Sequence, residues 1–503
     1  MKGSPRVTRL ALALLLSVGA GTALAQTSIT TGSKAFTENV ILGELLARLA
    51  ADAGAVAEHK GQLGGTRILW NALQRGDIDA YVEYTGTLSQ EILADSGATT
   101  EDEIRAALAA QGIVMTRPLG FNNTYALGMR EDVASEHGIT VISDLRDHPD
   151  LDLGFTNEFM DRGDGWPALR DHYALPHKRV KGLDHDLAYR GIEQGAIAVT
   201  DLYSTDAEIR YYELRVLRDD LSLFPPYEAV VVYRSDLEAR APEVAAAFRR
   251  LEGRVPEAEM IGMNARAKLA RIPEGRVAAD FLATTFQVDS VVVVDTWLQR
   301  LGRNTAAHLL LVLVALAAGI AIAVPTGIMA SRHEVAGQVA LGLSGILQTV
   351  PALALLVLMI PLVGINAPPA ILALFLYSLL PMVRNTCDGI RSIPASTWES
   401  ATALGLSSGA RLRLVELPLA MPSILAGVKI AAVQLVGFAT LGAFVGAGGY
   451  GQPILTGIRL DDFGLILEGA LPAAGLALVT QGVFELAERG LVSKGLRLRP
   501  ETG

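Results

Sequence analysis

The chain has 503 residues, of which 50% are hydrophobic and 19% charged, and its formal net charge is −10. This length suits two or three domains, and the acidic balance argues against a nucleic-acid partner. Cys387 is the only cysteine, which excludes an intrachain disulfide and a cysteine-based metal cluster. Residues 26–300 are acidic and of mixed polarity, whereas residues 305–487 consist mainly of uncharged apolar runs.

Residues 1–25 have the pattern of a secretory signal peptide. Three basic residues precede a short apolar run at 10–16, and Ala23-Leu24-Ala25 offers a small-residue cleavage site. An uncleaved anchor helix is the alternative, and the shortness of the run speaks against it. We therefore expect cleavage after Ala25 and a mature chain that begins outside the cytoplasm.

Residues 26–300 alternate strand-like apolar runs with helical patterns. A helix is expected over 39–53, where apolar residues recur at helical spacing. Strands are expected over 28–32, 78–82, 125–129, 151–155, 197–200 and 229–233. The alternation favours parallel sheets covered by helices, and a segment of this length suits two lobes.

Several tyrosines of this segment stand in turn-rich stretches beside predicted strand ends: Tyr84, Tyr125, Tyr203 and Tyr227. A quaternary ammonium group has no N–H to donate, so a protein holds it with aromatic faces, through cation–π attraction and burial. Tyrosines at such positions could form a cage of this kind. Ordinary half-buried packing is the alternative, and it is the commoner role of scattered tyrosines.

No catalytic or metal-binding constellation stands out in the sequence. The histidines of the segment lack zinc-ligand spacing, and no nucleophile–base arrangement is apparent. The sequence contains no Gly-Lys dipeptide and therefore no P-loop. We expect the chain to be no enzyme, to hold no metal or cofactor, and to lack an ATPase motor of its own.

Residues 301–503 have the pattern of a membrane domain with about five helices. Crossings are expected over 305–330, over 338–383 as two helices, over 421–445 and over 463–486. The stretch 338–383 is too long for one crossing, and 364–369 is its natural break. Glu468 is an acid inside the last crossing, and both a role in translocation and simple solvation near the outer end are open for it.

Basic residues in the loops give the orientation of these crossings. With residue 26 outside, an odd number of crossings places the C-terminus in the cytoplasm. The loops then predicted to be cytoplasmic hold Arg332, Arg384, Arg391, Arg411, Arg413, Arg489, Lys494, Arg497 and Arg499. In the loops predicted to lie outside, Arg459 is the one basic residue. This distribution obeys the positive-inside rule and predicts an inner-membrane protein whose amino-terminal half lies on the periplasmic or extracellular side.

A short charged insert, residues 399–418, interrupts the apolar runs on the predicted cytoplasmic side. Ser396 and Glu399 have the spacing of a capping box that would start a helix. Gly405 can end that helix with a positive φ. From capping alone, the insert could equally be a plain connector between membrane helices.

The stretch Gly32-Ser33-Lys34-x-Phe36-Thr37-Glu38-Asn39 is followed in order by 63–66, 76–87, 121–127, 158–165, 203–206 and 224–227. Together they resemble the substrate-binding proteins of the glycine betaine/carnitine/choline (osmoprotectant) ABC importers. The resemblance implies a two-lobed, hinged fold that closes on a ligand in the interlobe cleft.

The same resemblance implies the ligand-binding residues, which are Tyr84, Tyr125, Tyr203, Tyr227, Thr87, Lys34 and Arg162. Lys34 departs from the Gln of some choline and carnitine binders, and a cation at this position suits an anionic ligand end. Arg162 could equally be a hinge or surface residue.

Residues 347–355, 376–386 and 446–451 resemble the permease subunit of these importers, and the insert resembles the "EAA" motif of such permeases. Ser400 replaces the first Ala of that motif, and Val415 replaces its usual Ile. The resemblance implies a coupling helix that docks into a separate cytoplasmic ATPase, which would use the ATP, and a permease that pairs as a homodimer. The residues that carry the motif are Glu399, Ala401, Gly405, Leu417 and Pro418.

We interpret the chain as an α/β, two-lobed substrate-binding domain (26–300) followed by an all-α transmembrane permease domain (301–503). Its expected function is ABC import of a quaternary-ammonium solute such as glycine betaine, choline or carnitine. A histidine-derived betaine such as ergothioneine, or an amino-acid-like solute, is the alternative ligand. A ligand-gated channel or sensor would need no ATPase dock, and a membrane-anchored enzyme would need a catalytic cluster.

Overall fold

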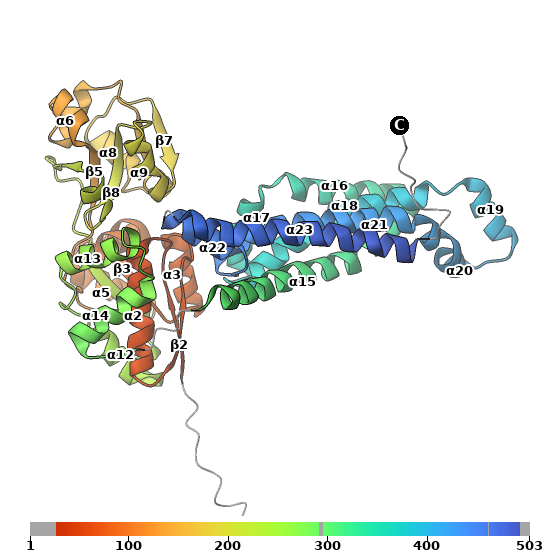
Figure 1. Ribbon diagram of the computed structural model, residues 1–503, viewed down its shortest axis with the longest axis horizontal. Helices are drawn as coiled ribbons and strands as arrows, with labels where there is room; N and C mark the ends of the chain where they lie inside the picture. The colour runs from red at the N-terminus through yellow and green to blue at the C-terminus, as the bar shows by residue number, and fades with distance from the viewer. Residues whose placement is uncertain (1–26, 291–294, 461, 493–503) are drawn as a thin grey trace, which may run out of the picture.

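The structure is a computed structural model, and it describes residues 27–290, 295–460 and 462–492. The predicted signal peptide and the predicted cytoplasmic C-terminus lie outside these residues. A two-lobed α/β half stands at one end of a long bundle of helices (Figure 1). The expected fold class is confirmed for both halves.

Each lobe is built on one five-stranded sheet. The first sheet has the order β2-β1-β3-β10-β4 and consists of β1 (Ser28–Gly32), β2 (Val56–Lys60), β3 (Ala80–Tyr84), β4 (Ile113–Met115) and β10 (Ala229–Arg234). The second has the order β7-β6-β8-β5-β9 and consists of β5 (Tyr125–Arg130), β6 (Leu153–Thr156), β7 (Val180–Leu183), β8 (Val199–Tyr203) and β9 (Leu214–Leu217). All the predicted strands are present, within a few residues of their expected bounds.

The expectation of parallel sheets is wrong in part, because both sheets are mixed. β10 runs antiparallel to β3 and β4, and β5 runs antiparallel to β8 and β9. The physical reason is that the chain crosses between the lobes, so the strand that follows each crossing enters its sheet from the opposite end. The two crossings pair with each other: Asn122 and Glu228 form a β-bridge, and the Asn123 amide donates to the Tyr227 carbonyl.

The helix α2 (Thr37–Asp52) is the central helix of the first lobe. Its residues Ile41, Leu45 and Leu49, one turn apart, are fully buried, as helical spacing predicts. The chain enters this helix directly from β1, so the amino-terminal turn of α2 points into the space between the lobes. The last turn of α13 (Glu257–Lys268) reaches the same space.

The remaining helical segments of the two lobes cover the sheets. They are α3 (Thr66–Arg75), α4 (Thr85–Thr87), η1 (Leu88–Ile92), η2 (Ala94–Ser96), α5 (Glu101–Ala109), α6 (Glu131–His137), η3 (Ile142–Asp147), α7 (Asn157–Asp161), α8 (Trp166–His172), α9 (His185–Glu193), α10 (Glu208–Tyr211), α11 (Leu237–Arg240), α12 (Pro242–Arg249) and α14 (Glu274–Phe286).

The helical half begins with α15 (Trp297–Arg332), so the predicted domain boundary at residue 300 falls inside this helix. The elements that follow are α16 (Glu334–Thr349), α17 (Ala352–Val363), α18 (Ala367–Arg391), α19 (Ala395–Ala403), α20 (Ser408–Arg411), η4 (Leu412–Glu416), α21 (Leu417–Phe438), η5 (Ala439–Val445), α22 (Gly451–Arg459) and α23 (Phe463–Leu491).

Among the described residues, four segments are long and apolar enough to cross a membrane: Trp297–Arg332, Ala367–Arg391, Ser408–Val445 and Phe463–Leu491. The pair α16 and α17 makes a fifth if it counts as one span, because it is bent by 101°. The predicted break at 364–369 is present. The bend at Pro351 was not predicted, and it follows from the missing N–H of proline and the extended backbone of Val350 before it.

Candidate functional site

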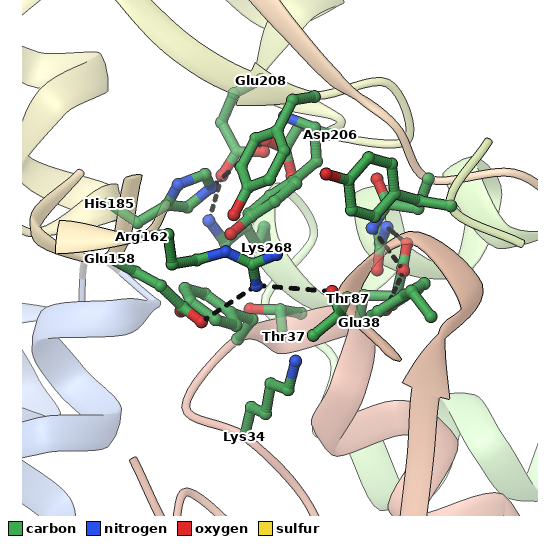
Figure 2. Close-up of a pocket in the computed structure, with 17 residues that line it drawn as sticks. Lys34, Thr37, Glu38, Thr87, Glu158, Arg162, His185, Asp206, Glu208 and Lys268 are labelled. Carbon is green, nitrogen blue, oxygen red and sulfur yellow. Dashed lines mark hydrogen bonds and ion pairs between the residues drawn. The ribbon is translucent and has the colours of Figure 1, made fainter. Parts of the chain in front are cut away.

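A pocket lies between the two lobes, with an empty volume of about 670 Å³ that is partly open to solvent. Its walls include all the residues predicted to bind a ligand: Lys34, Tyr84, Thr87, Tyr125, Arg162, Tyr203 and Tyr227. Figure 2 shows how side chains from both lobes converge on it. The structure therefore brings these residues together, and their role in binding stays a prediction.

The strand ends explain why residues so far apart in sequence meet in the interlobe pocket. Tyr84 is the last residue of β3. Tyr125 opens β5 and Tyr203 closes the antiparallel β8, so the two tyrosines are directly paired in register. Tyr227 lies in the second crossing between the lobes. Closure of the lobes thus determines how far Tyr84 of the first lobe lies from Tyr125 and Tyr203 of the second.

The aromatic side chains form a continuous cluster along one wall of the pocket. The ring centroid of Tyr125 lies 5.2 Å from that of Tyr203 and 5.4 Å from that of Tyr227. The planes of the Tyr125 and Tyr227 rings meet at an angle of 82°. Phe36 adds an edge-on contact to Tyr203 at 5.6 Å. Burial raises the pKa of Tyr125 and Tyr203, so their hydroxyl groups stay neutral. Faces and edges at these angles can surround a bulky cation.

Glu38, in the first turn of α2, is the most informative residue that sequence reasoning did not select. Glu38 lines the pocket, and the residue is 7% exposed. It accepts hydrogen bonds from the Tyr84 hydroxyl at 2.6 Å and from the Asn123 amide at 2.7 Å. The Thr205 hydroxyl and the Asn264 amide also donate to it. All these donors are neutral, and no ion pair reaches Glu38 from the described part of the chain.

Burial raises the pKa of Glu38, although the hydrogen bonds oppose this effect. A buried carboxylate that lacks a cationic partner is costly. Such a group is stabilised when a ligand supplies the missing positive charge. The sequence did contain a signal for it, since Glu38 belongs to the stretch 32–39, which links β1 to the first turn of α2.

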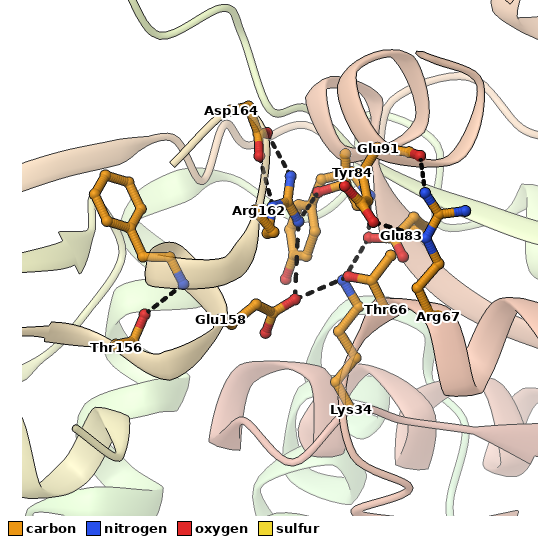
Figure 3. Close-up of polar contacts among 12 residues, drawn as sticks. Lys34, Thr66, Arg67, Glu83, Tyr84, Glu91, Thr156, Glu158, Arg162 and Asp164 are labelled. Atoms are coloured by element: carbon orange, nitrogen blue, oxygen red, sulfur yellow. Dashed lines mark hydrogen bonds and ion pairs between the residues drawn. The ribbon is translucent and has the colours of Figure 1, made fainter. Parts of the chain in front are cut away.

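The two basic residues predicted to meet the ligand are already paired, as Figure 3 shows. The Lys34 ammonium lies 2.7 Å from the buried Glu83 carboxylate. Arg162 donates to Asp164 at 2.7 Å, and the hydrogen bonds and charge of Arg162 outweigh the effect of burial and keep the pKa of Asp164 low. These pairs supply donors to the pocket without adding net positive charge.

Contacts between the lobes hold the pocket closed in this structure. The Thr66 hydroxyl of the first lobe donates to the Glu158 carboxylate of the second at 2.9 Å. Arg162 donates to the Thr87 hydroxyl at 3.4 Å, also across the cleft (Figure 2). These interactions connect the closed arrangement to residues that face the ligand space.

A second set of charged residues lines the pocket, and it consists of His185, Asp206, Glu208 and Lys268. The His185 ring lies 3.2 Å from the Asp206 carboxylate and packs against Tyr203, at 5.0 Å between ring centroids. Lys268 forms an ion pair with Glu208 from the opposite lobe. Burial acts to raise the pKa of Asp206, but the charge and hydrogen bond of His185 hold it below its ordinary value. The sequence analysis did not select His185, Asp206, Glu208 or Lys268 as site residues.

Comparison with known families connects this architecture to a transport system. Residues 27–284 match the family described as the substrate binding domain of the ABC-type glycine betaine transport system. Residues 293–492 match the binding-protein-dependent transport system inner membrane component. The chain belongs to this family of ABC importers. It is a substrate-binding domain fused to a permease domain.

Three curated relatives illustrate the similarity. The choline transport system permease protein OpuBB of Bacillus subtilis (strain 168) is 41% identical over 194 residues, which are 39% of this chain and 89% of that protein. The carnitine transport permease protein OpuCB of Listeria monocytogenes is 39% identical over 43% of this chain and 100% of that protein. The ergothioneine transport permease/ergothioneine binding protein EgtU of Helicobacter pylori (strain G27) is 30% identical over 52% of this chain and 48% of that protein.

The insert of the permease domain lies at the end of the helical bundle that is farthest from the binding domain (Figure 1). Helix α19 carries Glu399 on its exposed side and Ala401 on its buried side. Gly405 has a φ of 75°, as predicted for the residue that ends this helix. Leu417 and Pro418 begin α21. The insert is thus a turn of short helices, and its docking role stays a prediction.

The predicted capping box at the start of this insert is wrong. Pro394 occupies the cap position with an extended backbone, so α19 begins at Ala395 and Ser396 lies inside the helix. The fixed φ of proline is compatible with the extended backbone at this position, and because its side chain carries no acceptor, this helix has no side-chain cap. The Glu399 carboxylate therefore points to solvent.

Glu416 ties the insert to the rest of the permease domain. Its buried carboxylate accepts from the Arg411 guanidinium at 2.9 Å and from Arg332, at the end of α15, at 2.8 Å. The Arg411 guanidinium also stacks on Trp398, 3.5 Å from its ring centroid. Leu404 is 81% exposed beside this network.

Glu468, the intramembrane acid noted in the sequence, is neutralised by a neighbour. Its two carboxylate oxygens each lie 2.8 Å from the Arg300 guanidinium of α15. A bidentate pair of this kind fixes the ends of α15 and α23 to each other. This geometry supplies a structural role for Glu468.

Proposed function

We propose that the binding domain captures a quaternary-ammonium solute and that the permease domain carries it inward, driven by a separate ATPase. The observation that carries the proposal is the Glu38 carboxylate, buried beside the tyrosine cluster without a cationic partner in the described residues. A trimethylammonium group offers a positive charge and an apolar surface together. The pocket offers the matching carboxylate and aromatic faces.

The charge balance of the pocket favours a cation over a zwitterion. The carboxylates that line it are Glu38, Glu158, Asp206 and Glu208, and the basic residues are Lys34, Arg162, Lys268 and His185, which pairs with Asp206. Glu83 and Asp164 pair with two of these cations from behind. Because negative groups outnumber positive ones, we expect choline to bind more tightly than glycine betaine or carnitine, whose own carboxylates add negative charge.

The arrangement of the whole chain supports an import cycle. The binding domain stands at one end of the bundle and the insert 399–418 at the other (Figure 1). In the proposed cycle, the binding domain closes on the solute outside the membrane and delivers it to the permease. An ATPase docked on the cytoplasmic insert then drives the opening of the pore. Two copies of the permease would enclose this pore as a homodimer.

Calorimetric titration of the full chain in lipid nanodiscs tests the ligand class. The panel is choline, glycine betaine, carnitine and ergothioneine, with ordinary amino acids as controls. The proposal predicts binding of trimethylammonium compounds, with choline tightest, and none of the ordinary amino acids. Binding of an amino acid alone would contradict it, and tighter binding of ergothioneine than of choline would contradict the charge argument.

A further inference from the structure

Two buried amide oxygens in the wall of the interlobe pocket lack a hydrogen-bond partner. Asn123, in the first crossing between the lobes, is 7% exposed, and Asn264, in α13, is 2% exposed. Both residues line the pocket. Their Oδ1 atoms accept no hydrogen bond from residues 27–290, 295–460 and 462–492. A buried acceptor without a donor costs free energy, so a donor on the ligand would stabilise the loaded pocket.

The contacts of the amide nitrogens determine which way these two side chains point. The Asn123 Nδ2 donates to Glu38 at 2.7 Å. The Asn264 Nδ2 donates to Glu38 at 3.0 Å and to the Thr205 carbonyl at 3.1 Å. A flip of either amide would place its carbonyl oxygen against the Glu38 carboxylate, where neither group has a proton to donate. The two oxygens are therefore directed away from Glu38.

The elements that carry the two asparagines turn them toward the ligand space. Residues four apart on a helix share a face, and Lys268, four residues after Asn264 in α13, also lines the pocket (Figure 2). Asn123 stands at the entrance of β5, two residues before Tyr125 of the aromatic cluster. Both amides thus belong to the part of the wall that surrounds Glu38.

The polar groups around Glu38 leave acceptors for a ligand. The hydroxyl groups of Tyr84 and Thr205 donate to the Glu38 carboxylate, as the two amides do. A quaternary ammonium group compensates the charge of this carboxylate, but it has no N–H. It therefore leaves both amide oxygens unpaired. A hydroxyl group on the same solute can donate to one of them.

We propose that Asn123 and Asn264 select solutes that carry a hydroxyl group near the ammonium group, as choline does, and that this hydroxyl donates to one of the two amide oxygens. The inference deepens the proposed function and rests on it, because it adds a hydrogen-bond donor to the cation that the pocket requires. It makes the two asparagines specificity-determining residues. Glycine betaine has no O–H or N–H at neutral pH and leaves both oxygens without a donor.

Calorimetric titration of the full chain in lipid nanodiscs with analogues of choline tests the need for a donor. Ethyltrimethylammonium lacks the hydroxyl group and is smaller than choline. The methyl ether of choline keeps the oxygen without its proton and is larger. We expect both analogues to bind about tenfold more weakly than choline, or weaker still, because a buried acceptor then stays unpaired. Size alone cannot explain a loss of affinity in both directions.

Side-chain variants assign the contact to a residue. Asn123→Ala and Asn264→Ala each remove one acceptor, and in at least one of them the ratio of the Kd of the methyl ether to the Kd of choline should fall toward one. Each variant also removes a donor from Glu38, so Thr205→Val is the matched control. It removes another donor from Glu38 but no amide oxygen. It should weaken the binding of choline and of the ether alike and keep their ratio.

The outcomes separate the inference from the proposed function. Equal affinities of the native chain for choline, ethyltrimethylammonium and the methyl ether would overturn the inference, whereas the proposed function would stand. A ratio that keeps its native value in both asparagine variants would overturn the assignment to these residues. If no trimethylammonium compound binds, the proposed function fails, and the inference fails with it.

Discussion

Replacement of Glu38 by Gln removes the one pocket carboxylate that has no cationic partner in the described residues, while the shape of the side chain is kept. The amide oxygens of Asn123 and Asn264 have no hydrogen-bond partner among the described atoms, so these amides can rotate to accept from the new NH₂ group. The pocket should therefore keep its geometry. What changes is the charge that faces the ligand.

The size of the effect follows from the burial of this carboxylate. A trimethylammonium nitrogen cannot approach a carboxylate closer than its methyl groups allow, which is about 5 Å between charges. At an effective dielectric constant of about 20, two unit charges at this distance attract by about 3 kcal/mol. Loss of that attraction corresponds to a rise in Kd of about two orders of magnitude.

The assay is calorimetric titration of choline into the full chain in nanodiscs. Glu44→Gln is the matched control, because Glu44 lies on the same helix and pairs with Arg48 instead of lining the pocket. We expect Glu38→Gln to raise the Kd of choline about a hundredfold and Glu44→Gln to leave it unchanged. Equal affinity in Glu38→Gln and the native chain would refute the role given to this carboxylate.

Three other predictions concern pH, the aromatic cluster and the insert. Burial raises the pKa of Glu38 above 4.5, so choline affinity should fall as the pH drops through that raised pKa. If the Glu38→Gln variant shows the same fall in affinity, the pH dependence belongs to His185 or another pocket group. Tyr203→Ala should weaken choline binding by about 0.5–2 kcal/mol, whereas Tyr203→Phe keeps the ring and most of the affinity; equal Kd values for both would remove Tyr203 from the cage. Gly405→Val should stop uptake but leave choline binding intact, because a β-branched residue resists a positive φ. Gly409→Val is the control, since Gly409 has an ordinary φ and open space around it, and this variant should still transport choline. Normal uptake by Gly405→Val would contradict the coupling assignment.

The parts of the fold that depend on local pattern could be predicted from the sequence. The hydrophobic periodicity of α2 and of the strands that end in Tyr84 and Tyr203 is a local property, and these elements lie where expected. The positive φ at Gly405 was predictable for the same reason, since only glycine adopts it without strain. The family resemblance then selected the pocket residues, of which Tyr84, Tyr125 and Tyr203 stand at strand ends.

Other features depend on contacts between distant residues and could not be predicted. The ion pair between Lys34 and Glu83 joins residues near the ends of two different strands. Lys34 was expected to bind the anionic end of a ligand, but this pairing neutralises its charge. The antiparallel placement of β10 follows from the path of the chain between lobes. The contact between Arg459 and Thr37 joins residues from the two domains, and no local pattern records it.

The most direct test of the whole account is choline uptake by the native host, which supplies the ATPase subunit. A strain that lacks this chain is complemented with the native chain or with Glu38→Gln, and intracellular labelled choline is measured with and without depletion of ATP. The account predicts accumulation against the gradient with the native chain, its loss on ATP depletion, and little uptake with Glu38→Gln at low choline. Equilibration that continues without ATP would indicate a channel, and uptake equal to that of the deleted strain would contradict import of choline by this chain.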